Sequence, residues 1–113
     1  MEEGRNGDFG VTPTQRTLKK LRAEGYTAAV VEKWNPHARI RQDLFGVVDV
    51  IGIRDGETLA VQATSGSNVS SRVKKITDAE ATPMIRAAGW RFVVHGWRKG
   101  ANGRWSCREV DLS

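Results

Sequence analysis

The chain has 113 residues, carries a formal net charge of +5 at pH 7 and contains a single cysteine. This length suits one domain, which buries roughly two-thirds of the surface that its unfolded chain exposes and can hold its core without disulfides. No apolar run approaches the ~20 residues that span a bilayer, so the sequence predicts no membrane-crossing helix. The first ten residues, MEEGRNGDFG, are acidic and glycine-rich, unlike a signal peptide. We therefore expect a flexible lead-in over residues 1–11 and one domain over residues 12–113.

The cysteine and the histidines argue against a disulfide framework and a zinc site. Cys107 has no partner for an internal disulfide, which is typical of a protein of the reducing cytoplasm, and we expect it to be a half-buried strand residue. His37 and His95 lie far apart in the sequence and match no zinc-ligand spacing. The tryptophans are mostly predicted to lie in the core or at a dimer interface: Trp34, Trp90, Trp97 and Trp105. Trp90 suits the core best, whereas Trp97 and Trp105, beside Arg98 and Arg104, could stack on bases or pack against a partner.

The first half of the chain predicts one helix and two strands. Thr12 suits the N-cap of a helix, Pro13 suits its first position, and Gly25 suits the residue that ends it. Asn35-Pro36 breaks the β-rich stretch that follows. The segments after the helix are read as a strand, a polar basic loop and a second strand: residues 26–34, 36–42 and 46–54.

The second half predicts a hairpin, two helical segments and a final pair of strands. Asp55-Gly56 is the signature of a two-residue type I′ turn, and Ser70 or Ser71 suits the cap of the next helix. The remaining segments are a strand over 57–64, a loop over 65–69, helices over 70–77 and 79–88, and strands over 90–97 and 105–112. The resulting αβββαββ order predicts the α/β (α+β) class, with a mixed central β-sheet flanked by helices.

The Asp-Gly turn fixes a register that can be counted along DLFGVVDVIGIRDGETLAVQATSGSN. Because Arg54 pairs with Glu57 across a two-residue turn, Asp49 falls opposite Gln62, and two residues further out position 47 falls opposite Thr64. Directly opposed residues have Cβ atoms ~5 Å apart on one face of the sheet. Asp49, Gln62 and Thr64 are therefore expected to share a face. The other face is expected to be core: Val48, Val50, Leu59, Val61 and Ala63.

An aspartate in the middle of a strand needs a reason, because burying a carboxylate without partners is costly. One interpretation is a hydrogen bond from Gln62 to Asp49 on a half-exposed face of the sheet. The other is a site for a divalent metal or a nucleic acid, which the polar and basic neighbouring loop favours. The residues alone leave both interpretations open.

The order of elements and the polar positions resemble the PD-(D/E)XK nuclease superfamily. The resemblance rests on an N-terminal helix, a meander that carries Asp49, a next strand that ends with Gln62 and Thr64, and a following helix. It covers roughly residues 12–97 and is most similar to small, phage-type Holliday-junction-resolvase-like proteins. It implies a restriction-endonuclease-like core, a metal-dependent endonuclease acting on DNA, possibly branched, and a homodimer. A phage-encoded protein would work in the host cytoplasm.

The family motif is only partly present. Asp49 matches the aspartate that ligates the metal, whereas Gln62 stands where the family has Glu or Asp and Thr64 stands where it has Lys. A glutamate that resolvase-like members carry on their first helix falls near Gln15. Of the four positions implied by the resemblance, only Asp49 carries the family's residue. The other three carry Gln62, Thr64 and Gln15.

Two further acids and two lysines could complete such a site. Asp43 lies six residues before Asp49 and could lean into the site from the loop. Glu32 is either a displaced carboxylate of the site or an exposed edge residue. Lys74 or Lys75, on the next helix, could reach back and replace the missing lysine charge.

The resemblance implies Mg²⁺ (or Mn²⁺) as cofactor. Such an ion would take oxygen ligands from Asp49, from the amide oxygen of Gln62, from the backbone carbonyl of Ala63 and from water. Asp49, Gln62, Thr64 and Asp43 are the predicted catalytic set.

Basic and polar residues lie on both sides of the motif, as expected for a surface that faces phosphates. The predicted nucleic-acid-binding residues are Arg39, Arg41, Ser67, Asn68, Arg72, Lys74 and Lys75. A third basic group crowds the last hairpin and is expected to join them if the fold allows: Arg98, Lys99 and Arg104. The alternative function is a catalytically weak or inactive nuclease-fold protein that binds nucleic acid or a protein partner.

Overall fold

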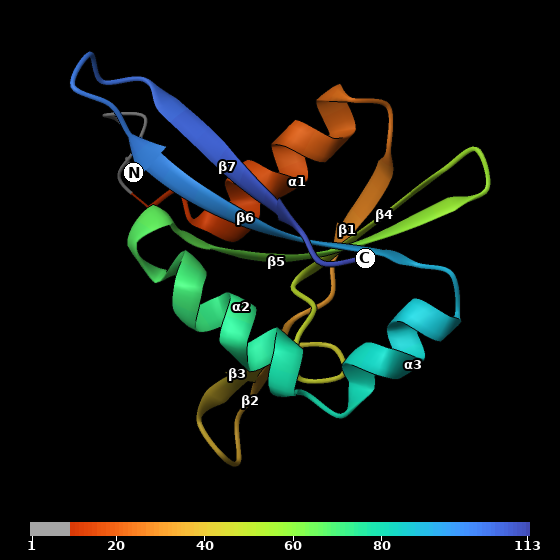
Figure 1. The fold of residues 1–113 in the computed structure, drawn as a ribbon. Helices are drawn as coiled ribbons and strands as arrows, with labels where there is room; N and C mark the ends of the chain where they lie inside the picture. Colours follow the sequence, from red (N-terminus) through yellow and green to blue (C-terminus); the bar gives the residue numbers. More distant parts are fainter. Residues whose placement is uncertain (1–9) are drawn as a thin grey trace.

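The computed structural model describes residues 10–113, which form a five-stranded mixed sheet with helices on both faces (Figure 1). The helices are α1 (Pro13–Ala23), α2 (Val69–Asp78) and α3 (Ala81–Ala87), with a 3-10 turn, η1 (Gly66–Asn68). The sheet contains, in spatial order, β1 (Thr27–Val30), β4 (Val50–Arg54), β5 (Glu57–Ser65), β6 (Arg91–Lys99) and β7 (Trp105–Asp111). Only β5 and β6 pair in parallel. The predicted class, α+β with a mixed sheet flanked by helices, is confirmed.

A second, two-stranded sheet projects from the body of the molecule (Figure 1). It consists of β2 (Lys33–Asn35) and β3 (Ile40–Gln42), paired antiparallel. The sequence predicted one strand over residues 26–34 and a loop over 36–42, and both predictions are wrong in part. The first strand ends at Val30, and the chain then leaves the main sheet to form the hairpin.

Local signals set α1 and the main hairpin as predicted. The Thr12 hydroxyl accepts a hydrogen bond from the Gln15 N–H, and the Gln15 side chain accepts one from the Thr12 N–H, which forms a complete capping box. Gly25 follows the helix with a φ of 94°, a conformation that glycine adopts without strain. Arg54 pairs with Glu57 across the Asp55-Gly56 turn, as counted.

Helices cover both faces of the sheet, so its strands are apolar on both sides. On one face, α1 contributes Leu21 to a buried cluster with Val50, Val61 and Val93. On the other face, α2 and α3 supply Val69, Ile76 and Ile85, which pack with residues of the sheet: Ala60, Phe92 and Val94.

The strand predicted over residues 46–54 begins only at Val50. A turn precedes it, closed by pairing of Leu44 with Val48 and helped by Gly46 at a φ of 79°. Val47 therefore lies in this turn and does not pair with Thr64, whose partner is Gly96 on β6.

Asp49 interrupts the regular pairing of β4 with β5. Val50 is the ladder partner of Val61, yet the Asp49 N–H also donates to the Val61 carbonyl oxygen at 2.9 Å, so two residues oppose one, as in a β-bulge. Val48 and Val50, predicted to share a face, consequently belong to the two opposite cores.

The start of α2 lies very close to the sheet. Gly96 faces Val69, and a Cβ at Gly96 would lie 2.2 Å from the Val69 side chain. The helix starts after Asn68, one or two residues earlier than predicted, and neither Ser70 nor Ser71 caps it. This close approach fixes the helix that carries Arg72 and Lys75.

Buried polar groups beneath α1 are structural. The Thr17 hydroxyl lies 3.1 Å from His95 Nδ1 and accepts a hydrogen bond from Trp97 Nε1 at 3.0 Å. Burial, and secondarily the charge of Lys20, lowers the pKa of His95 to about 4. Cys107 is half-buried on β7, as predicted, and burial raises its pKa to about 11. None of the helices within residues 10–113 is long and apolar enough to cross a membrane.

Candidate metal centre

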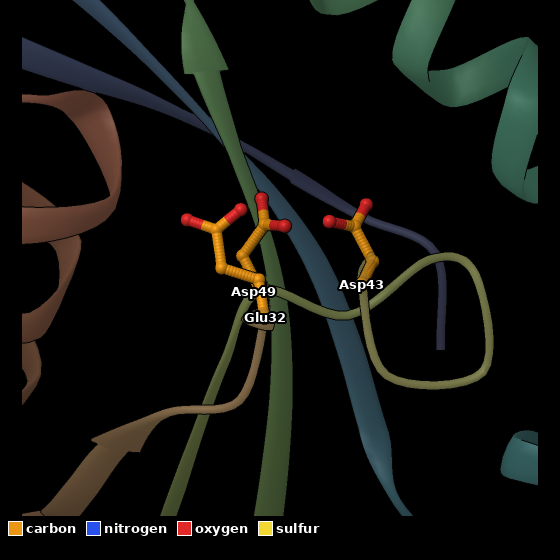
Figure 2. Close-up of side chains that lie close together, drawn as sticks. All are labelled: Glu32, Asp43 and Asp49. Atoms are coloured by element: carbon orange, nitrogen blue, oxygen red, sulfur yellow. The ribbon is translucent and has the colours of Figure 1, made fainter. Parts of the chain in front are cut away.

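Three carboxylates from separate segments meet beside the end of β5. Glu32 follows β1, Asp43 follows β3, and Asp49 precedes β4. One oxygen atom from each lies within 4.8 Å of the others, so this cluster could hold a metal ion. Figure 2 shows Glu32 and Asp49 side by side, with the Asp43 carboxylate facing them from the neighbouring turn.

The topology explains why acids so far apart in sequence converge. Lys33 pairs with Gln42 at the base of the β2–β3 hairpin, and Glu32 and Asp43 are the residues immediately outside that pair. The hairpin therefore brings both to one place. The Val31 N–H donates to the Asp49 carbonyl oxygen at 2.8 Å, which puts the end of β1 beside Asp49.

Asp49 is the buried member of the three, with 5% of its surface exposed. Its Oδ2 accepts a hydrogen bond from the Ala63 N–H at 2.9 Å. Burial, reinforced by the contact with Asp43, raises the pKa of Asp49 to about 8. A low-dielectric site disfavours the charged form, and a second carboxylate disfavours it further.

The pKa of Asp43 shifts in the opposite direction from that of Asp49. Burial alone would raise its pKa, but hydrogen bonds with Asp49, Gln62 and Lys75 outweigh burial, and the pKa is lowered. The raised pKa of Asp49 favours a proton on the Asp49–Asp43 pair when no metal is bound. A divalent cation would take the place of that proton.

Gln62 lies on β5, is fully buried, and hydrogen-bonds to several residues of the site. Its Nε2 donates to Asp43 Oδ2 at 3.2 Å and to the Val47 carbonyl oxygen at 2.8 Å. Its Oε1 accepts from Arg72 at 3.3 Å and from Lys75 at 3.4 Å. Among these contacts, the acid that Gln62 holds is Asp43 and not the Asp49 expected from the register.

Lys75 reaches the site from α2, as one of two lysines was predicted to do. Its Nζ lies 3.1 Å from Asp43 Oδ2. Lys74 instead pairs with Asp78 at 2.9 Å, because consecutive helical residues point about 100° apart. A positive charge therefore stands at the carboxylates, carried by α2 and not by the strand.

The other predicted ligands and catalytic residues have different surroundings. Ala63 contributes its N–H to Asp49, while its carbonyl remains only a predicted ligand. Thr64 is buried on β5 and pairs with Gly96. Gln15, at the helix-1 position, is used in the capping box. The acids that the geometry brings to Asp49 are Glu32 and Asp43.

Part of the predicted nucleic-acid surface assembles beside the carboxylates. Arg41 and Lys75 line a polar cleft of about 420 Å³ together with Gln42, Asp43 and Gly46. Arg72 donates a hydrogen bond to Gln62 next to this cleft, whereas Arg39 is exposed at the far turn of the β2–β3 hairpin.

The remaining polar and basic residues lie elsewhere. Ser67 and Asn68 belong to η1, at the other end of α2, where both contact the Ser65 hydroxyl. The basic group on the β6–β7 hairpin lies at the opposite end of the molecule from β2–β3, so the three basic groups do not form one surface (Figure 1).

Comparison with known proteins adds no family assignment: no protein-family model matches this chain, and no curated protein does.

Proposed function

We propose that the chain is a metal-dependent nuclease that hydrolyses phosphodiester bonds in DNA, a small variant of the PD-(D/E)XK type. The observation that carries the proposal is the meeting of Glu32, Asp43 and Asp49 within 4.8 Å, with Lys75 3.1 Å from Asp43. The basic cleft beside them supports a substrate that carries phosphates.

The three carboxylates suit Mg²⁺ or Mn²⁺, which take hard oxygen ligands. Oxygens that share one octahedral ion with bonds of about 2.1 Å lie roughly 3–4 Å apart, and the oxygens of the three acids lie within 4.8 Å of one another. A bound ion would neutralise charge on the scissile phosphate and activate water for attack. Glu32 and Asp43 take the places that the sequence assigned to Gln62 and Ala63.

The surrounding residues have separate tasks. Gln62 holds Asp43 through a hydrogen bond from Nε2. Its Oε1 accepts hydrogen bonds from Arg72 and Lys75. Lys75 supplies a charge that stabilises the phosphate as negative charge develops in the transition state. Arg41 binds a neighbouring phosphate from the wall of the cleft. These residues offset the repulsion between a polyanion and three acids.

Cutting two strands symmetrically calls for a homodimer. An apolar cleft of about 370 Å³ that includes Phe45, Met84 and Trp90 offers a surface for it, and Met84 is 73% exposed. Light scattering coupled to gel filtration tests this: we expect a dimer that Met84→Asp converts to monomer, and a monomeric wild type contradicts it.

The cleavage assay tests the function itself. Linear, supercoiled and four-way-junction DNA are incubated with the protein in Mg²⁺, in Mn²⁺ or in EDTA, alongside Asp49→Asn. We expect cleavage that requires the metal and disappears in Asp49→Asn. Cleavage that survives both EDTA and the substitution would show that these residues are not the active site.

A second candidate function is binding without cleavage. It is favoured by Gln62, a neutral amide at the position where the family carries a carboxylate, and by the proton that Asp49 retains. Salt-sensitive binding of DNA with no cleavage in either metal would select it.

A further inference from the structure

The β2–β3 hairpin, residues 33–42, is an arm that stands beside the metal centre and projects from the sheet (Figure 1). Its sequence, KWNPHARIRQ, contains three Lys or Arg residues, one His and no acid. Glu32 and Asp43 are the residues immediately before and after it. The arm is therefore a positively charged hairpin whose two ends continue directly into acids of the proposed active site.

The register of the arm places an aromatic ring next to a guanidinium group. Trp34 pairs directly with Arg41, so their side chains lie on the same face of the hairpin, with Cβ atoms about 5 Å apart. Arg41 and its neighbour Gln42 both line the polar cleft with Asp43 and Lys75, so the base of the arm borders the cleft. Ile40 pairs with Asn35 and lies on the opposite face.

Trp34 was expected in the core or at a dimer interface, and the core placement is wrong, because 52% of its surface is exposed in the single chain. An exposed indole flanked by cations suits a ligand with flat aromatic groups and a negative backbone, which is a nucleic-acid strand. A protein patch that buried Trp34 would also have to neutralise Lys33, Arg39 and Arg41. Charge complementarity therefore favours the nucleic acid.

The arm is organised before any ligand binds. The Asn35 side chain accepts hydrogen bonds from the N–H groups of His37 and Ala38, at 3.0 and 3.2 Å. It also donates to the Gln42 side chain at 3.2 Å, across the hairpin. A hairpin backbone held by such hydrogen bonds loses little conformational freedom on binding.

We propose that the arm binds an unpaired nucleotide, with Trp34 stacked on its base and Arg41 on an adjacent phosphate. Bases within a duplex are stacked on each other and offer no free face to Trp34, whereas a single-stranded tract or a branch point does. The inference rests on the proposed function and deepens it: the substrate class is nucleic acid with unpaired bases close to the cut.

Fluorescence anisotropy in EDTA and low salt tests the arm without cleavage. The probes are a labelled oligothymidine of about 20 nucleotides, longer than the ~4–16 nucleotides that single-strand-binding modules cover, and a blunt duplex of equal length. The proteins are wild type, Trp34→Ala, Trp34→Phe and Ile40→Ala, the last a control on the other face of the arm. Circular dichroism checks that each is folded.

We expect Trp34→Ala to weaken binding of the single strand roughly 5- to 100-fold and to leave duplex binding unchanged. Trp34→Phe should retain most of the single-strand affinity, and Ile40→Ala should retain all of it. An unchanged affinity in Trp34→Ala, an equal loss on both probes, or no single-strand binding by the wild type overturns the inference.

The two proposals can fail separately. Asp49-dependent cleavage together with Trp34-independent binding would reject the arm and keep the nuclease. Trp34-dependent binding of the single strand without cleavage in any metal would keep the arm and reject the nuclease.

Discussion

Lys75 Nζ lies 3.1 Å from Asp43 Oδ2, although 32 residues separate the two in sequence. The contact joins α2 to the turn before β4 and brings a cation to a cluster of three acids. It also restores, from a helix, the charge that Thr64 cannot supply from the strand.

Replacing Lys75 should impair cleavage much more than replacing its neighbour. We expect Lys75→Ala to lower kcat roughly 10²-fold, because it removes a charge that stabilises the transition state. Lys74→Ala is the matched control, since Lys74 pairs with Asp78 on the exposed side of α2. Equal rates for the two variants under single-turnover conditions would remove Lys75 from the mechanism.

Introducing a carboxylate at position 62 should make stability depend on metal. In Gln62→Glu, the hydrogen bonds to Asp43 and to the Val47 carbonyl oxygen are lost and a fourth acid is added to the cluster of three. We expect a loss of about 1–3 kcal/mol in the free energy of unfolding in EDTA. Mg²⁺ should raise the Tm of this variant more than that of the wild type, as thermal unfolding measured with and without Mg²⁺ will show; equal shifts contradict the prediction.

Without metal, the free energy of unfolding should fall as the pH rises from about 6.5 to about 8. The pKa of Asp49 in the folded protein is raised to about 8, so folding retains a proton that the unfolded chain has released, and this stabilisation is lost as the pH rises. One pKa unit corresponds to about 1.4 kcal/mol, which limits the loss over this window to about 2 kcal/mol. Urea unfolding in EDTA measures it, and Asp49→Asn should abolish the slope.

At lower pH a second group acts with the opposite sign. The pKa of His95 is lowered to about 4 from an ordinary value of 6.5, so the unfolded chain binds the proton first and the contribution of His95 to stability falls as the pH drops from 6.5 to 4. Asp49, whose ordinary pKa is 3.8, contributes with the opposite sign over the same range, so the His95 contribution is measured in the Asp49→Asn background. His95→Gln should remove this part of the pH dependence. If the free energy of unfolding of that variant depends on pH between 4 and 6.5 as before, another group is responsible.

Gly96→Ala should destabilise the protein by about 1–3 kcal/mol, because the new Cβ would meet the Val69 side chain at 2.2 Å. Gly66→Ala is a milder control, since the nearest atoms lie 3.4 Å away, on the flexible side chain of Arg98. Urea unfolding that gives Gly96→Ala wild-type stability would show that α2 can move away from the sheet at no cost.

Local signals in the sequence were sufficient for most of the fold. The Thr12 cap, Gly25 and the Asp55-Gly56 turn each act within a few residues, and the register counted from that turn holds as far as Val50 and Val61. It fails at Asp49, where a bulge shifts the alternation. Nothing in the period-two pattern distinguishes a strand that continues from one that bulges.

The site could be predicted only in part, because its residues converge through tertiary structure. Asp49 stood out as an acid in an apolar strand, Asp43 was predicted to lean into the site from the loop, and Glu32 was an open alternative. The sequence does contain a signal for this convergence. The segment WNPHARIRQ can form a hairpin that turns at Pro36–Arg39, and this hairpin brings the flanking acids together. Reading residues 36–42 as a loop separated Glu32 from Asp43.

Titration of Mn²⁺ by isothermal calorimetry tests most directly whether Glu32, Asp43 and Asp49 form one divalent-metal centre. We predict one site per chain in the wild type, lost or weakened at least about 10-fold in Glu32→Gln, Asp43→Asn and Asp49→Asn. Glu109→Gln, an exposed acid on β7, should bind as the wild type does. Binding that persists in Glu32→Gln and Asp43→Asn, or no binding by the wild type, would contradict the account.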